Sequence, residues 1–125
     1  MKAGDTFLLE NRAVDGHLWV VISDPGLDGD RVLFVSMTCY DITKENACLI
    51  NVGEHPFVQH KTCIAYDFAR VATLEMLNNL EDQGHLRRNV PISAELLERI
   101  RQGVSLSRRI EYGYVELMIE QGLLD

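Results

Sequence analysis

Hydrophobic positions in the first two-thirds of the chain gather in short runs that are rich in β-branched residues. Such runs predict β-strands when turn-forming residues bound them, and runs without polar alternation predict strands buried on both faces. Asp24-Pro25-Gly26 and Gly53-Glu54-His55-Pro56 are two of these turn-forming segments, because proline removes a ladder donor and favours a turn. The predicted strands are residues 6–9, 17–23, 31–38, 47–52 and 62–66, the last continuing towards residue 71.

The last third follows a helical period instead. Thr73 and Ser93 each stand where a helix N-cap is expected, just before an apolar stripe. The predicted helices lie between Thr73 and Gly84, over residues 94–102 before Gly103, and over residues 107–121 before Gly122, with a short strand at 87–90. Short strands followed by helices predict a mainly β domain with C-terminal helices, in which the helices pack on a small β-barrel.

Composition narrows the class of protein. The 125 residues, 46% of them hydrophobic, fit one globular domain over residues 1–125. The apolar runs are far shorter than the roughly 20 residues of a membrane span, and the first residues lack a signal-peptide core. The cysteines, Cys39, Cys48 and Cys63, are odd in number and include no close pair. They therefore predict neither a disulfide framework nor a zinc site, and we expect a cytoplasmic protein.

Charge restricts how the chain can meet nucleic acid. Twelve basic and nineteen acidic residues give a net charge of −7, which argues against broad non-specific binding to phosphates. The acidic excess lies mainly towards the two ends, whereas residues 61–90 hold four acidic and four basic residues. A local phosphate site in the middle of the chain is therefore compatible with the overall charge.

The order and spacing of several short motifs resemble the MazF/PemK (Kid-like) toxins of bacterial toxin–antitoxin pairs. The resemblance covers roughly residues 4–103, with an apparent insertion around residues 73–84 and an extra C-terminal helix within residues 104–125. The motifs are Gly4-Asp5-Thr6-Phe7-Leu8, Val20-Val21-Ile22-Ser23-Asp24-Pro25, Val35-Ser36-Met37-Thr38-Cys39, residues 62–70 and Ser93-Ala94-Glu95-Leu96-Leu97-Glu98-Arg99-Ile100.

The resemblance implies an SH3-like small β-barrel of the MazF/PemK/CcdB type. It also implies a homodimer that cleaves single-stranded RNA without a metal or other cofactor and that a cognate antitoxin neutralises. In that family a Thr or Ser after the third strand acts at the scissile phosphate, and it maps onto Thr38. The family's Arg has no counterpart, since His17 stands in the corresponding stretch. The missing Arg and the charge of −7 favour an alternative, a non-catalytic SH3-like barrel module that binds a protein partner or peptide. The retained Thr38 and the available histidines favour RNA cleavage by a divergent member of the family, which is the leading prediction.

Metal-free RNA cleavage needs a base for the 2′-hydroxyl, an acid for the leaving oxygen and a cation for the phosphate charge. Histidine can transfer either proton near neutral pH. The candidate catalytic residues are therefore His17, His55 and His60, with Thr38 as a hydroxyl that bonds the phosphate. The competing interpretation is that these side chains are ordinary strand-end or loop residues. No ligand spacing marks a metal site around His55 and His60.

The candidate substrate-binding residues are Tyr66, Arg70, Arg87 and Arg88. Strand alternation predicts that Tyr66, Phe68 and Arg70 share one face, with Phe68 in the core, Tyr66 stacking on a base and Arg70 supplying a cation. Arg87 and Arg88 form a basic pair that either binds phosphate or lies on a solvated face. The C-terminal helix either seals the barrel, forms a dimer contact or stands in for a partner helix. If it covers the RNA groove, the nuclease hypothesis fails.

Overall fold

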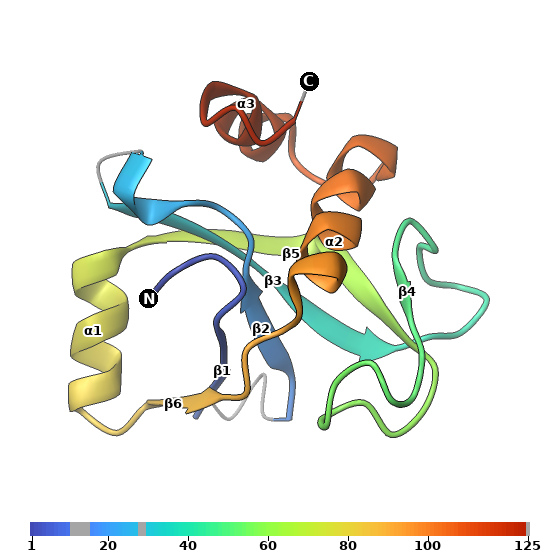
Figure 1. The fold of residues 1–125 in the computed structure, drawn as a ribbon, viewed down its shortest axis with the longest axis horizontal. Coiled ribbons are helices and arrows are strands. Elements are labelled where there is room, and N and C mark those ends of the chain that lie inside the picture. The colour runs from blue at the N-terminus through green and yellow to red at the C-terminus, as the bar shows by residue number, and fades with distance from the viewer. Residues whose placement is uncertain (11–15, 28–29, 125) are drawn as a thin grey trace.

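A computed structural model describes residues 1–10, 16–27 and 30–124. Six antiparallel strands form a single curled sheet that resembles half of a barrel, in the order β4-β5-β3-β2-β1-β6 (Figure 1). The mainly β architecture with C-terminal helices is therefore confirmed. The strands are β1 (Thr6–Leu9), β2 (Leu18–Val21), β3 (Arg31–Cys39), β4 (Leu49–Ile50), β5 (Thr62–Thr73) and β6 (Leu86–Asn89), and a 3-10 turn spans Pro25–Leu27.

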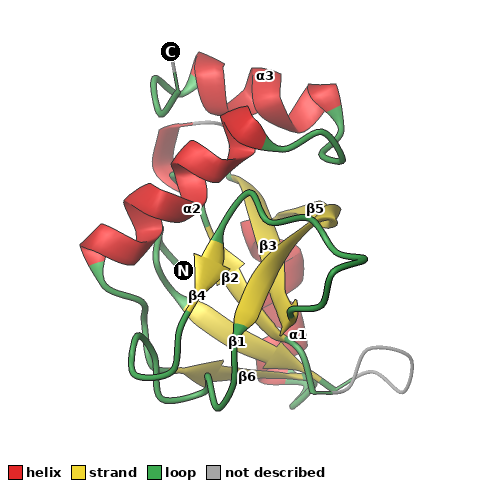
Figure 2. Ribbon diagram, turned by 90° about the vertical axis from the view of Figure 1, so that its right-hand side faces the viewer, coloured by secondary structure: helices red, strands yellow, loops and turns green. Residues whose placement is uncertain are grey.

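Helices lie on both faces of the sheet. Helix α1 (Leu74–Asp82) buries Leu77 against one face, whereas α2 (Ala94–Leu106) and α3 (Tyr112–Glu120) bury apolar side chains against the other (Figures 1 and 2). Alternation along β2 shows this division, because Leu18 and Val20 belong to the core under α2 while Trp19 and Val21 belong to the core under α1. Buried strands with apolar side chains on both faces are thus explained by helices on both sides.

Most predicted elements are confirmed, and their ends follow local hydrogen bonding. Thr73 caps α1 by accepting from the Met76 amide at 3.1 Å, and Ser93 caps α2 by accepting from the Leu96 amide at the same distance. Strand β4 is shorter than predicted, and the helix expected from residue 107 begins only at Tyr112. The prediction that Gly103 ends its helix is wrong, because α2 continues to Leu106.

Gly103 is required by packing rather than by helix termination. A Cβ at this position would lie 2.0 Å from the Tyr66 hydroxyl oxygen and 2.8 Å from Cζ of the same ring. The Tyr66 hydroxyl donates to the Ile100 carbonyl oxygen at 2.7 Å, and the side chain is only 1% exposed. Tyr66 therefore ties β5 to α2 at a helix position where the absence of a side chain leaves space for its ring.

An irregular stretch of β5 overturns the predicted side-chain alternation. Phe34 pairs with Arg70 and Ser36 with Ala65, so one residue of β3 faces four residues of β5. This bulge lets Tyr66 point into the core under α2 while Phe68 lies 60% exposed. The prediction that Tyr66, Phe68 and Arg70 share a face, with Phe68 in the core, is wrong, because extra residues in a strand break its period of two.

The C-terminal helix packs on the sheet core. Leu117 and Met118 of α3 are buried with residues of β2 and β3, and the Asp24 amide donates to Gln121 Oε1 at 2.8 Å. Arg31 of β3 forms an ion pair with Glu120 at 3.9 Å. Of the three roles predicted for this helix, its contacts correspond to sealing the sheet. Within the described part of the chain, no helix has the length and apolar character needed to cross a membrane.

Candidate functional site

One face of β3 changes character halfway along its length. Val32 and Phe34 lie in the apolar cluster that contains Leu77 of α1, whereas the next residues on that face, Ser36 and Thr38, line a cavity of about 250 Å³. We call the first part, with Phe7, Val21, Val32 and Phe34, the covered half of this sheet face. The part with His17, Ser36, Thr38, Phe68 and Arg70 is the open half, and Trp19 lies between the two.

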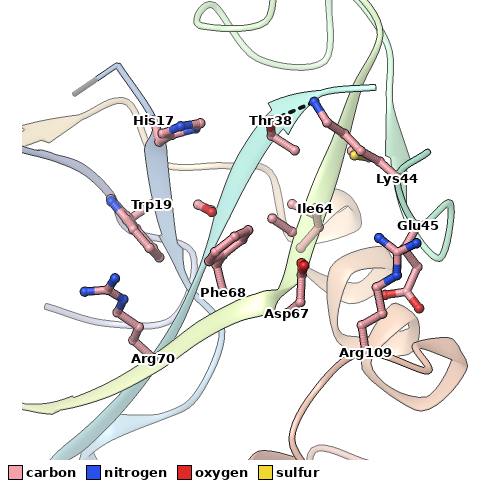
Figure 3. A pocket seen from close by; sticks show the side chains of 13 residues that line it. His17, Trp19, Thr38, Lys44, Glu45, Ile64, Asp67, Phe68, Arg70 and Arg109 are labelled. Atoms are coloured by element: carbon pink, nitrogen blue, oxygen red, sulfur yellow. Dashed lines mark hydrogen bonds between the residues drawn. The ribbon is translucent and has the colours of Figure 1, made fainter. Parts of the chain in front are cut away.

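The cavity on the open half, here the first cavity, joins side chains that lie far apart in the sequence. Figure 3 shows Arg70 and Trp19 on one side, Lys44 and Arg109 on the other, and the Phe68 ring between them. Three of its lining residues, His17, Thr38 and Arg70, were predicted from the sequence. The remaining lining residues are Trp19, Ser36, Lys44, Glu45, Cys63, Ile64, Ala65, Asp67, Phe68 and Arg109.

The hydrogen bonding of His17 defines which ring nitrogen is available. Nδ1 lies 3.2 Å from the Met37 carbonyl oxygen. Because a carbonyl only accepts, this bond requires a proton on Nδ1, which leaves Nε2 of the neutral ring as a lone-pair acceptor. His17 is half-buried and lines the cavity. The arrangement therefore gives the pocket an imidazole nitrogen able to accept a proton.

Lys44 places a cation beside the Thr38 hydroxyl. Its Nζ donates to the Cys39 carbonyl oxygen at 2.5 Å and lies 3.4 Å from Thr38 Oγ1 (Figure 3). Asp41 Oδ2 is 3.5 Å from the same ammonium. Hydrogen bonds from Thr43, followed by the charge of Lys44, hold the pKa of Asp41 below its usual range. The loop after β3 thus folds back so that a positive charge stands at the end of the strand.

Two further cations border the first cavity. The Arg70 guanidinium lies over the Trp19 ring, 5.6 Å from its centroid, which is within cation–π range. Arg109 donates to the Thr43 carbonyl oxygen at 3.1 Å. Glu45, in contrast, is used structurally, because its carboxylate accepts from the Ser107 hydroxyl and the Arg108 amide and so ties this loop to the segment between α2 and α3.

The sequence alone did not identify Lys44, Trp19 or Arg109 as site residues. A usable signal was present for the open half, since Val32, Phe34, Ser36 and Thr38 change from apolar to hydroxyl side chains at a period of two. No comparable signal exists for Arg109, which reaches the cavity only because α2 carries the following segment there.

A second, wider cavity of about 630 Å³ adjoins the first, and His17 and Thr38 line both. His60 lines only this second cavity, where its Nε2 contacts the Sγ of Cys39. Phe57 and Gln59 contribute further lining. The predicted residues His17, Thr38 and His60 are therefore gathered around adjoining spaces, although His60 is engaged by a thiol.

His55 lies in the core rather than in a site. It is 4% exposed, its Nε2 donates to the Val90 carbonyl oxygen at 2.6 Å, and its Nδ1 accepts from the Phe57 amide at 3.1 Å. Both ring nitrogens are thus occupied by the backbone, so the predicted catalytic role does not fit. The prediction that Tyr66 stacks on a base is wrong for a similar reason, since its ring is buried against α2 and presents no face to a base.

Arg87 and Arg88 lie on β6, at the edge of the sheet, and neither lines the two cavities. Arg87 pairs with Glu10 at 3.2 Å, and Arg88 pairs with Glu81 at 2.8 Å and with Asp5 at 3.5 Å. The hydrogen bond from Arg88 lowers the pKa of Glu81. This pair forms surface ion pairs with nearby acids and is not brought together with the other candidates.

Within residues 1–10, 16–27 and 30–124, no group of three or more His, Cys, Asp or Glu side chains is placed to hold a metal ion. Compared with known proteins, the chain matches no protein-family model and no curated protein sequence.

Proposed function

We propose that this chain is a divergent MazF/PemK-like toxin with an SH3-like barrel, and that it cleaves single-stranded RNA where the two cavities meet. The observation that carries the proposal is that His17 and Thr38 line both cavities, with Lys44 beside Thr38. A single-stranded RNA that ran from one cavity to the other would have a phosphate between these residues. On this proposal the chain acts in the cytoplasm as a homodimer, and a cognate antitoxin neutralises it.

The proposed chemistry uses one base and one acid. His17 Nε2 takes the proton of the 2′-hydroxyl, whose oxygen attacks the phosphorus and forms a 2′,3′-cyclic phosphate. The bond to the 5′-oxygen breaks, and the Lys44 ammonium donates a proton to that oxygen. Arg70 stabilises the negative charge that develops on the phosphate. Lys44 is assigned the acid role because His60 Nε2 is held by Cys39.

Recognition of a single strand is favoured by the aromatic groups of the first cavity. Phe68 is 60% exposed, although large aromatic side chains are usually buried. Unpaired bases stack on aromatic rings and on guanidinium planes, and both Phe68 and Arg70 are available here. A local group of cations also explains how a chain with a net charge of −7 can bind RNA.

The position of α3 supports the nuclease hypothesis, because this helix does not line the cavities where the RNA would bind. None of its residues lines either cavity, and its buried side chains face the opposite sheet face. The condition under which the hypothesis would fail, a helix lying over the groove, is not met in the described part of the chain.

The test is cleavage of a fluorescent single-stranded RNA by the purified protein in the presence of a chelator, with detection of cyclic-phosphate ends. We expect His17→Ala to slow cleavage by about 10²–10⁴-fold, the usual contribution of a general base. His85→Ala is the matched control, since His85 is exposed and lines neither cavity. RNA that the folded wild type binds but never cuts would support the non-catalytic binding module instead.

A further inference from the structure

Cys39 and His60 form a thiol–imidazole pair at the rim of the second cavity. Cys39 ends β3, is exposed, and has its Sγ in hydrogen-bonding contact with His60 Nε2. Both side chains line the cavity of about 630 Å³. A thiol in contact with an imidazole can pass its proton to the ring and become a thiolate, which is the nucleophilic form of cysteine.

A cation lies close to this pair. The Lys44 ammonium lies 2.5 Å from the carbonyl oxygen of Cys39 itself. Asp41, an acid on the same loop, accepts from the Thr43 amide and pairs with Lys44. Reactive cysteines occupy electropositive and partly exposed positions of this kind.

The other two cysteines provide an internal contrast. Cys48 is 5% exposed and Cys63 is 1% exposed. Burial raises the pKa of both thiols, so they stay protonated. Any reagent that needs an accessible thiolate is thereby directed to Cys39.

We propose that Cys39 is a modification site for low-molecular-mass disulfides, with His60 as its activating base. The Cys39 proton moves to His60 Nε2, and the resulting thiolate attacks one sulfur of the disulfide. A new S–S bond forms to Cys39, the original S–S bond breaks, and the second half leaves as a thiolate that takes up a proton. Cys39 is oxidised, and the reagent is reduced by the release of one thiol.

The modification places its added group in the second cavity. His17 and Thr38 form the wall that this cavity shares with the first. A tripeptide-sized adduct on the adjoining Cys39 would occupy the space beside them. This consequence rests on the proposed function, and it predicts that modified protein neither binds nor cuts RNA until a reducing agent removes the adduct.

The test uses glutathione disulfide as the probe and intact-mass measurement of the full chain, followed by peptide mapping. We expect one adduct, located on Cys39, and none on Cys39→Ser. An unactivated thiol is only a few per cent ionised at neutral pH, so we expect His60→Ala to slow adduct formation by about tenfold. His85→Ala, which removes an exposed histidine away from the pair, should react at the wild-type rate.

Two outcomes would overturn the proposal: an adduct on Cys48 or Cys63 of the folded protein, or an unchanged rate in His60→Ala. His60→Gln provides a second variant that keeps a polar side chain while removing the base, and it should be as slow as His60→Ala. Adduct formation is measured without RNA, so absence of RNA cleavage by the unmodified wild type would count against the proposed function alone. Cleavage that is equally fast with and without the adduct would overturn only the link between the two.

Discussion

The covered half of the sheet face presents Phe7, Val32 and Phe34 to α1, whereas the open half of the same face presents Thr38 and Arg70 to a cavity. Both halves use the same strands and the same alternating backbone. The difference lies in the side chains, because apolar groups gain free energy when a helix removes them from water and polar groups do not. The comparison teaches that α1 packs on the apolar part of the face, whereas the cavity lies on the part that carries polar side chains.

Arg70 on the open half differs from the arginines near the covered half in its partners. Near the covered half, Arg88 is bound by Glu81 and Asp5, and Arg87 by Glu10. In the open half, Arg70 stacks on Trp19 and has no carboxylate partner among the residues that the structure describes. A cation paired with a carboxylate contributes little attraction to a phosphate, whereas the guanidinium of Arg70, with no such partner among the described residues, can bind one.

The largest expected effect separates the two halves by stability. Phe34 is 4% exposed, and its ring lies 5.4 Å from that of Phe7 and 5.3 Å from that of Trp19. We expect Phe34→Ala to lower the free energy of unfolding by about 3–5 kcal/mol, through lost burial and the cavity it leaves. Thr38→Ala, four residues along the same face, should cost less than about 0.5 kcal/mol while reducing RNA cleavage.

Urea unfolding of both variants, monitored by tryptophan fluorescence, measures these differences. Equal losses of stability at Phe34 and Thr38 would mean that the two halves are not distinct in the way the packing indicates. Retained cleavage in Thr38→Ala would remove that hydroxyl from the proposed chemistry while leaving the packing argument intact.

A second change acts on the contact between α2 and β5 beside the bulge. Ala at position 103 would collide with the Tyr66 ring, which anchors β5 before Phe68 and Arg70 emerge on the open half. We expect Gly103→Ala to destabilise the protein by about 1–3 kcal/mol, even though alanine favours a helix by about 1 kcal/mol over glycine. Thermal unfolding measures the loss.

Gly113→Ala is the matched control for this change, because nothing lies within 4 Å of a Cβ at that position of α3. It should stabilise α3 slightly. If Gly103→Ala were as stable as the wild type, Tyr66 could not be the rigid anchor that the contact with Ile100 indicates.

Local patterns predicted the elements, because helix caps, turn residues and apolar runs act over a few neighbouring positions. Thr73 and Ser93 cap their helices as expected, and each strand appears near its predicted place. The bulge in β5 could not be predicted, since it depends on where Tyr66 meets α2. Gly103 was misread for the same reason, because a glycine required for close packing looks like one that ends a helix.

The candidate site was predicted in part. His17 and Thr38 were predicted because the resemblance places the family's active groups at these positions, and the structure brings the two side chains together. His55 resembled them in the sequence, yet its ring is buried and bonds two backbone groups, the Phe57 amide and the Val90 carbonyl oxygen. The second of these lies far away in the sequence, so the contact could not be predicted. Lys44 was missed because its position beside Thr38 depends on how the loop after β3 folds back.

A third prediction tests the contrast between free and paired cations. Arg70→Ala should weaken the binding of single-stranded RNA by roughly five- to tenfold, or about 1 kcal/mol. It should also make binding less dependent on salt, by the share of roughly one phosphate contact. Arg87→Ala removes the same charge from a residue paired with Glu10, outside both cavities, and should leave binding nearly unchanged.

Fluorescence anisotropy at several salt concentrations measures both variants. If Arg87→Ala weakened binding as much as Arg70→Ala, overall charge would determine RNA binding, and the open half would not be the specific binding site.

The smallest expected effect concerns a paired charge outside the open half. Arg99 donates to the Glu54 carboxylate and to the Leu49 carbonyl oxygen, which ties the loop after β4 to α2. This hydrogen bond is the main reason that the pKa of Glu54 lies below its ordinary value of 4.5. In the partly exposed setting of this pair, we expect Glu54→Gln to cost about 0.5–1 kcal/mol at neutral pH.

That cost should depend on pH in one direction. The lowered pKa means that the folded protein binds the Glu54 proton less tightly than the unfolded chain does. The ion pair therefore contributes its full stability above about pH 4.5, and that stability is lost as the pH falls through the lowered pKa. The stability gap between the wild type and Glu54→Gln should therefore close on acidification, as measured by urea unfolding across this range. Glu116→Gln, at an exposed position of α3, should show no such gap at any pH. A gap that stayed open at a pH low enough to protonate Glu54 in the folded protein would show that Glu54 acts through packing, since its charge is then gone.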